Sequence, residues 1–209
     1  GQGLDQDALW ARSAWNARTG ARTVTDLADL PAGDWLLKSE HSSSGRGLRR
    51  ATDDASTRGW LRRQGHVVAE PFLDRVLDLS AVYRGSKLLG LTRPLNDRGG
   101  RYRGHVVGHA FEGLAPEVQR VVHGLRDRYH QLGKDIALDG RWGIDLMVYC
   151  QDGQLRVREV VEVNPRTTFG HYALALRRVF PRGGTFRIVP PDRVGDAIPL
   201  TDPSTANRF

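Results

Sequence analysis

The sequence has almost none of the features that mark a secreted or membrane protein. Cys150 is its single cysteine, so an internal disulfide is impossible and a reducing compartment is favoured. No apolar run approaches the roughly 18 residues that a membrane-spanning helix needs, and the first ten residues carry no basic, apolar leader. We therefore expect a cytoplasmic protein without a membrane partner.

Lysine is also scarce, because only Lys38, Lys87 and Lys134 occur and arginine supplies most of the positive charge. The 31 Lys and Arg residues exceed the 24 Asp and Glu residues, which gives a formal net charge of +7. This balance suits anionic partners such as nucleotides, nucleic acids or acidic metabolites, although an arginine bias can also reflect genome composition. The arginines are scattered rather than clustered with aromatics, which argues against a nucleic-acid partner.

The sequence does contain alternating helical and strand-like segments, as expected of a mixed α and β protein. Helices are predicted at 5–18, 53–64, 115–132 and 169–180, and strands at 34–39, 66–72, 76–84, 86–95, 141–150, 154–163 and 185–189. Gly133 is predicted to cap the third helix. Residues 97–105 are rich in Gly and Arg, which predicts a mobile loop.

One strand ends in an unusual way, in the stretch EVVEVNPRTTFG at 159–170. Its valines are typical of a buried strand, whereas Glu162, Asn164 and Arg166 are not. Pro165 ends the ladder because it lacks a backbone N–H. Arg166 could bind a phosphate or a carboxylate with two parallel hydrogen bonds. Simple solvent exposure on a half-buried sheet is the alternative interpretation.

A hairpin would bring a second acid to this strand end. If Asp152-Gly153 is a two-residue turn, Asp145 pairs with Val160, and Asp145 shares one face with Glu162 and Asn164. The two carboxylates are then diagonal neighbours, with Cα atoms roughly 7–8 Å apart. Such hard oxygen ligands suit Mg²⁺ rather than zinc. A bulge in either strand would change this register.

Three segments in this order resemble the ATP-grasp superfamily, of the carboxylate–amine ligase type. RWGIDLMVYCQDGQLRVREVVEVNPR at 141–166 resembles its metal-binding hairpin, and WLLKSEHSSSGRGL at 35–48 resembles its strand, lysine and glycine loop. HVVAEPFLDRVLDLSAVY at 66–83 is similar to its hinge strand, which is followed by an acid that contacts the ribose. The resemblance covers about residues 24–180.

The resemblance implies an α+β fold in which two subdomains with antiparallel sheets grip ATP, without the usual N-terminal domain. It implies an N-terminal helix in 1–23, a small subdomain with the glycine loop in 24–75, a large subdomain with the metal-binding hairpin in 76–180, and a C-terminal tail in 181–209. ATP and Mg²⁺ would be the cofactors, with Mn²⁺ as an alternative ion.

The resemblance also implies a role for each matching residue. Asp145, Glu162 and Asn164 would bind the metal, and Arg166 and Arg93 would contact the transferring phosphate or the substrate. The nucleotide would be held by the following residues: Lys38, Ser42, Ser43, Ser44, Gly45, Arg46, Gly47, Glu70, Phe72, Leu73 and Asp78. Asp78 stands where the family pattern has a glutamate. Lys38, Arg93 and the 42–47 loop could equally be solvent-exposed residues without such roles.

One departure from the family pattern concerns a second phosphate-binding lysine, which is expected well before Lys38. No lysine precedes Lys38. A cleaved chain, a second chain that supplies the missing half, or a reduced family member would each account for this. The expected function is an ATP-dependent ligase that joins a small-molecule carboxylate to an amine through an acyl phosphate. A non-catalytic nucleotide-binding subunit of a larger assembly is the alternative.

Overall fold

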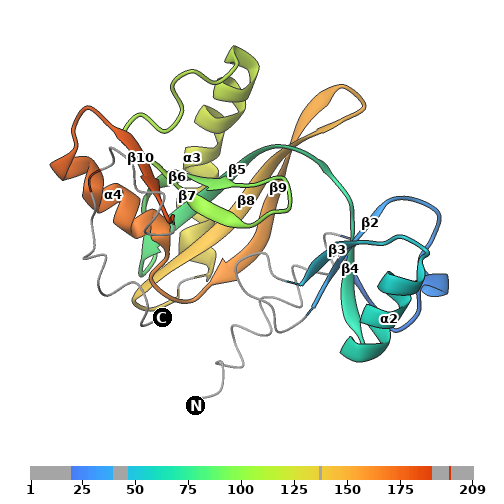
Figure 1. The fold of residues 1–209 in the computed structure, drawn as a ribbon. Coiled ribbons are helices and arrows are strands. Elements are labelled where there is room, and N and C mark those ends of the chain that lie inside the picture. Colours follow the sequence, from blue (N-terminus) through green and yellow to red (C-terminus); the bar gives the residue numbers. More distant parts are fainter. Residues whose placement is uncertain (1–19, 40–46, 137, 190–197, 199–209) are drawn as a thin grey trace.

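The computed structural model describes residues 20–39, 47–136, 138–189 and 198. These residues form two antiparallel β-sheets of different size, each covered by helices (Figure 1). The α+β prediction is therefore confirmed. The helix predicted at 5–18, loop residues 42–46 and nearly all of the tail after 189 lie outside the described residues.

The smaller sheet has four strands in the order β1-β4-β2-β3. The strands are β1 (Arg22–Val24), β2 (Trp35–Lys38), β3 (Leu48–Arg50) and β4 (Val67–Pro71), with a short 3-10 helix at Leu27–Asp29 and α2 at Ala55–Gln64. Alternate residues of β2 and β4 are buried in one cluster with Leu61 of α2. One face of this sheet therefore packs on α2, and Lys38 and Glu70 lie on the other face.

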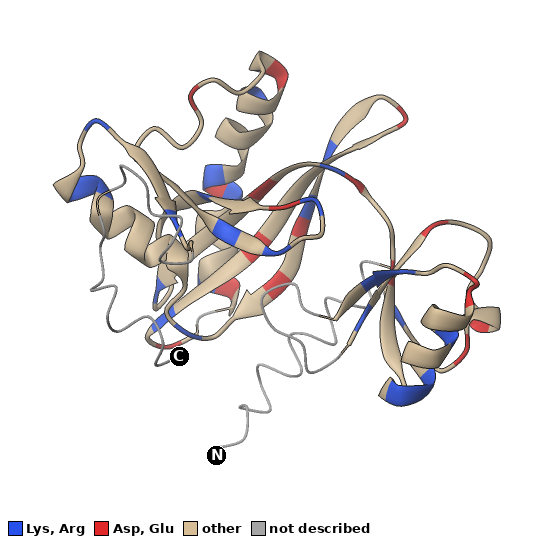
Figure 2. Ribbon diagram, in the orientation of Figure 1, with Lys and Arg blue, Asp and Glu red and all other residues tan. Residues whose placement is uncertain are grey.

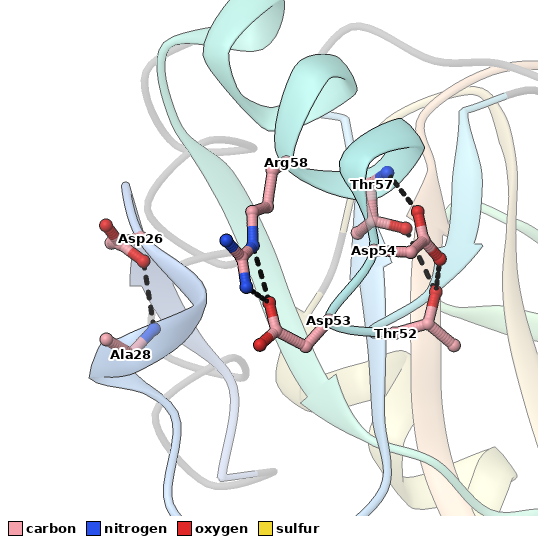
Figure 3. A network of polar contacts seen from close by, with 7 residues as sticks. All are labelled: Asp26, Ala28, Thr52, Asp53, Asp54, Thr57 and Arg58. Carbon is pink, nitrogen blue, oxygen red and sulfur yellow. Dashed lines mark hydrogen bonds and ion pairs between the residues drawn. The ribbon is translucent and has the colours of Figure 1, made fainter.

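Helix α2 begins where a side chain satisfies one of its free N–H groups (Figure 3). The Asp54 carboxylate accepts a hydrogen bond from the backbone N–H of Thr57 at 2.7 Å, as expected of an N-cap residue. Arg58 donates to Asp53 at 2.6 Å in the same turn. Gly65 ends the helix with a φ of 77°, which a residue with a side chain adopts only with strain.

The larger sheet has six strands in the order β10-β7-β6-β5-β8-β9. They are β5 (Asp74–Arg84), β6 (Lys87–Asn96), β7 (Tyr102–Val107), β8 (Arg141–Gln151), β9 (Gln154–Asn164) and β10 (Gly184–Arg187). Helix α3 (Pro116–Ile136) covers one face, and α4 (Phe169–Val179) lies on the opposite side (Figure 1).

The core lies between α3 and the central strands β5 and β8. Val118, Val122 and Tyr129 of the predicted α3 stripe are buried against these strands. The Tyr83 hydroxyl donates to the backbone carbonyl of Tyr129 at 2.9 Å, and the Tyr83 ring stacks on Trp142 with centroids 4.1 Å apart. Within the described part of the chain, no helix is both long and apolar enough to cross a membrane.

Two expectations about glycines are wrong. The 97–105 segment is not wholly a loop, because residues 102–107 form β7 between β6 and β10. Gly104 belongs to this strand with a φ of 154°, and a Cβ there would lie 2.0 Å from the carbonyl oxygen of Phe186 in β10. Gly133 lies inside α3 rather than after it, where a Cβ would come within 2.5 Å of the Tyr83 ring. Both glycines allow close approach of the chain.

The predicted hairpin turn is present, and the predicted register is confirmed from Gln151 and Gln154 as far as Met147 and Arg158, but it is wrong beyond that pair. Asp152 and Gly153 have φ angles of 51° and 72°, as a type I′ turn requires. Further along, Met147 pairs with Arg158, whereas Asp145 pairs with Glu162. The bulge therefore places three residues of β9 opposite a single residue of β8. Because the shift is two residues, Glu162 keeps its face and moves directly opposite Asp145.

Candidate functional site

The two sheets line one cleft with a volume of about 820 Å³. The small sheet contributes Lys38 and Glu70, and the large sheet contributes Asp78, Asp145 and Glu162. All five lie on sheet faces turned away from the α2 and α3 cores, because residues alternate between the two faces of a strand. Figure 2 shows acidic segments on the long central strands of the larger sheet.

Two carboxylates face each other on the large-sheet wall. Asp145 and Glu162 are directly paired, which puts their Cα atoms about 5 Å apart. The Asn164 amide donates to Oδ2 of Asp145 at 2.9 Å, and the Ser80 hydroxyl donates to Oδ1. In the part of the chain that the structure describes, neither carboxylate forms an ion pair with a basic side chain. Negative charge is therefore concentrated here.

The electrostatics of this group favour a cation. The pKa of Asp145 is raised to about 6, mainly because the carboxylate is buried and also because of the negative charges of Glu162 and Asp78, while hydrogen bonds from Ser80 and Asn164 oppose the rise. A divalent cation beside Asp145 would remove this penalty. The donors are two carboxylates and the Asn164 amide oxygen, which are hard ligands that fit Mg²⁺.

No larger ligand cluster is available in the described residues, since no group of three or more His, Cys, Asp or Glu side chains is placed to hold a metal. The Oδ1 atom of Asn164 accepts from the Arg166 guanidinium at 3.2 Å. Arg166 also lines the cleft. The strand end singled out in the sequence thus combines an acid, an amide and a guanidinium at one position on the cleft wall.

On the small-sheet wall, one carboxylate is paired with two cationic side chains. Oε2 of Glu70 lies 2.7 Å from Nζ of Lys38 and 2.9 Å from Nη2 of Arg158. Glu70 and Arg158 are only 4% and 9% exposed. Nε of Arg158 is buried without a hydrogen-bond partner among the described residues. Arg158, which comes from β9 of the larger sheet, therefore links the two sheets through Glu70.

The expected nucleotide contacts between β4 and β5 also line the cleft. Phe72 and Leu73 form the short connection between these strands, and Asp78 follows in β5. The Asp78 carboxylate is held at Oδ2 by Arg75 at 3.1 Å and by Asn96 at 2.8 Å. These bonds leave Oδ1 of Asp78 able to accept another hydrogen bond.

Two residues expected at the site are placed differently. Arg93 does not line the cleft in the described structure, and its guanidinium donates to the backbone carbonyl of Ala110 at 3.4 Å. Gly47 has a φ of 80° and does not line the cleft either. The remaining loop residues, 42–46, lie outside the described residues.

Several cleft residues were not predicted from the sequence, among them Ser80, Asn96 and Arg158. Ser80 offered a signal, because it is a polar residue within the buried run of β5. Arg158 offered none, since a charged residue alternating with valines is typical of a half-exposed strand.

Comparison with protein families and with curated proteins gives no match to this chain. Solved structures do match. N5-carboxyaminoimidazole synthetase from Staphylococcus aureus, solved with ADP, is 16% identical with a TM-score of 0.55, over 80% of this chain and 47% of that one. An L-amino acid ligase from Bacillus licheniformis is 17% identical with a TM-score of 0.53, over 82% and 44%. The chain has the ATP-grasp fold.

A third ATP-grasp structure, biotin carboxylase from Campylobacter jejuni in complex with β-γ-ATP, matches with a TM-score of 0.56 at 13% identity, over 80% of this chain and 42% of that one. The chain thus spans less than half the length of each of these three structures. At such low identity the likeness shows the fold alone. The cleft between the two sheets of this ATP-grasp fold holds most of the described residues that the resemblance assigns to ATP and metal.

Proposed function

We propose that the chain is the ATP-binding portion of an ATP-dependent carboxylate–amine ligase. A substrate carboxylate would accept the γ-phosphoryl group of ATP, releasing ADP and forming an acyl phosphate. An amine nitrogen would then attack the acyl carbon, and phosphate would leave with the electrons of the broken C–O bond. The ammonium form of the amine loses two protons along the way, one of which the phosphate takes up, so one amide, ADP, hydrogen phosphate and one free proton result.

The observation that carries this proposal is the pairing of Asp145 with Glu162 at a cleft that Lys38 also lines. Two facing carboxylates without a basic partner in the described residues are costly unless a cation joins them. Asp145, Glu162 and Asn164 would hold Mg²⁺, which when bound neutralises the charge on the phosphates. Arg166, beside Asn164, would bind the transferring phosphoryl group.

The other cleft residues fit the nucleotide. Lys38 would bind the α-phosphate, and backbone groups of Glu70, Phe72 and Leu73 would meet the adenine. Oδ1 of Asp78 would accept from a ribose hydroxyl, because both of its present partners bind Oδ2. We further propose that residues 42–47 cover the phosphates and that 24–75 and 76–180 act as the two gripping subdomains.

The decisive test replaces Glu162 with Gln. We expect Mg²⁺-dependent release of ADP, assayed with panels of carboxylates and amines, to fall about 10²–10³-fold, because the metal loses a ligand. Glu159→Gln is a matched control in the same strand, since Glu159 pairs with Arg128 of α3 instead of lining the cleft. Equal ADP release by the Glu162→Gln variant and the unaltered chain would refute the metal assignment.

A second candidate is a non-catalytic nucleotide-binding subunit. Of the three lysines, Lys38 alone lines the cleft of the described structure, so a second lysine for the phosphates is absent there. In that case the chain would bind Mg·ATP, measured by calorimetry, without releasing phosphate from any substrate pair. Phosphate release that appears only when a co-purifying chain is added would indicate that a partner completes the site.

A further inference from the structure

Two aromatic rings form part of the cleft wall beyond the carboxylates. The rings of Tyr102 in β7 and Phe169 at the start of α4 are stacked, with centroids 4.7 Å apart and an angle of 14° between their planes. Both residues line the cleft. Phe169 nevertheless leaves 41% of its surface exposed. An exposed apolar ring in a cleft wall is a typical contact for an apolar ligand group.

Phe169 is held in place by its surroundings. Phe186 and Tyr172 lie 6.0 Å and 6.1 Å from its ring centroid. The next residue, Gly170, brings the first turn of α4 so close to β6 that a Cβ there would lie 2.7 Å from the Thr92 hydroxyl. The exposed face of Phe169 is thus a fixed surface, and binding to it costs little side-chain entropy.

A chain of hydrogen bonds fixes the role of the Tyr102 hydroxyl. The Thr92 hydroxyl donates to the carbonyl of Ser80 at 3.2 Å, so it accepts from Nε2–H of His105 at 3.2 Å. Nδ1 of His105 then carries no proton, and it accepts from the Tyr102 hydroxyl at 2.8 Å. Because Tyr102 has already donated its proton, its oxygen can only accept from a ligand.

These hydrogen bonds make the Tyr102 oxygen a hydrogen-bond acceptor with a fixed orientation, and they do not make Tyr102 or His105 a base. Burial lowers the pKa of His105 to about 4, so the imidazole stays neutral near pH 7. Burial also raises the pKa of Tyr102, so its hydroxyl stays protonated. The Tyr102 oxygen therefore favours ligand groups that donate hydrogen bonds, such as an amine, over groups that can only accept.

The same series of hydrogen bonds connects Tyr102 to the carboxylate of Asp145. Ser80 is paired across the sheet with Thr92 on one side and with Asp145 on the other. Its carbonyl accepts from Thr92, and its hydroxyl donates to Asp145. Only residues 165–168 separate the polar strand end from Phe169. A ligand group on Tyr102 and Phe169 would therefore lie in the same rigid frame as the proposed reaction centre.

We propose that Tyr102 and Phe169 form the binding site of the amine co-substrate, and that this amine carries an aromatic or bulky apolar group. The hydroxyl of Tyr102 accepts from the amine N–H, and the face of Phe169 packs against the apolar group. His105 and Thr92 are positioning residues, because they orient the hydroxyl without touching the amine. This inference rests on the proposed ligase function, which supplies the amine.

The test measures amine binding without turnover, by NMR titration of the 209-residue chain with phenethylamine and with ethylamine. We expect phenethylamine to bind more tightly, and Phe169→Ala to reduce the ratio of the two dissociation constants by about fivefold. Val179→Ala is the control on the same helix: Val179 is an exposed apolar residue of α4 that does not line the cleft, and the ratio should stay unchanged. Thermal unfolding of each variant verifies its fold.

Tyr102→Phe removes the hydroxyl and keeps the ring, so it tests the contribution of the hydroxyl alone. It should weaken the binding of both amines by about fivefold. The ratio of their dissociation constants should stay unchanged, because the stack with Phe169 remains. Equal affinity of the two amines for the unaltered chain would overturn the proposal. So would weaker binding of Mg·ATP by Phe169→Ala, because the stack would then serve the nucleotide. Failure of ADP release both with and without a co-purifying chain would refute the ligase function while leaving these binding ratios measurable.

Discussion

The two walls of the cleft handle charge in opposite ways. On the small-sheet wall, the Glu70 carboxylate is neutralised by Lys38 and Arg158 at 2.7 and 2.9 Å. On the large-sheet wall, Asp145 and Glu162 face each other with no basic partner in the described structure. One carboxylate is therefore already paired with cationic side chains, whereas the other two are the ones proposed to need a bound cation. This difference separates an ion pair that links the two sheets, between Glu70 and Arg158, from the carboxylate pair that is proposed to bind a metal.

The largest effect on stability is expected for the variant Glu70→Gln on the small-sheet wall. We expect the free energy of unfolding to fall by about 3 kcal/mol, because Arg158 would be left as a buried, uncompensated charge. Urea denaturation followed by circular dichroism measures the change. The double variant Glu70→Gln/Arg158→Met should recover most of the loss, since it removes both buried charges. Unchanged stability in the single variant would mean that the small-sheet wall does not depend on this ion pair.

On the opposite wall, Asp145→Asn should stabilise the metal-free chain. The pKa of Asp145 is raised from 3.8 to about 6 in the folded chain, so folding favours its protonated form. The stability from this group is fully present below about pH 4 and is lost as the pH rises through 6. At pH 7.5 in EDTA the variant should therefore be more stable than the unaltered chain by about 2 kcal/mol.

Denaturation at pH 4 and at pH 7.5 checks the sign of this effect. The gain should vanish at pH 4, where both chains carry a neutral group at this position. Excess Mg²⁺ at pH 7.5 should stabilise the unaltered chain and leave the variant unaffected. A variant that is less stable at pH 7.5 would show that the charge on Asp145 is already compensated.

The smallest effect is expected for an exposed charge on the small-sheet side. Arg50 pairs with Asp34 at 2.8 Å, but their side chains are 53% and 68% exposed. Arg50→Ala should lower the free energy of unfolding by less than about 0.5 kcal/mol, because water screens such pairs. A loss above 1 kcal/mol would point to the contact of its guanidinium with the Phe72 ring, 4.4 Å away.

The parts of the fold with strong local signals could be predicted from the sequence. The α3 stripe and the Asp152-Gly153 turn are examples, because each depends on neighbouring residues. The identity of β7 could not be predicted, since its Gly104 resembles loop composition and is required only by the distant carbonyl of Phe186. The short strands β1 and β3 show no periodicity, because three residues are too few.

Some polar residues of the cleft could be predicted from the sequence, and others could not. Glu162 and Asn164 could be found because they interrupt a valine run at a strand end. Ser80, whose hydroxyl donates to Asp145, lies 65 residues away from Asp145 in the sequence, and only the sheet pairing brings the two together. The pairing of Glu70 with Arg158 likewise depends on two different sheets meeting.

The bulge in β9 has a consequence for how such a site can change. Two additional residues in β9 shift the pairing of every later residue with β8 by two positions. Each side chain nevertheless stays on the same face of the sheet. Insertion or deletion of such a pair would therefore alter the spacing between Asp145 and Glu162 while the buried and exposed positions stay in phase. In a sheet with one buried face, paired insertions offer a way to vary ligand separation that leaves the core intact.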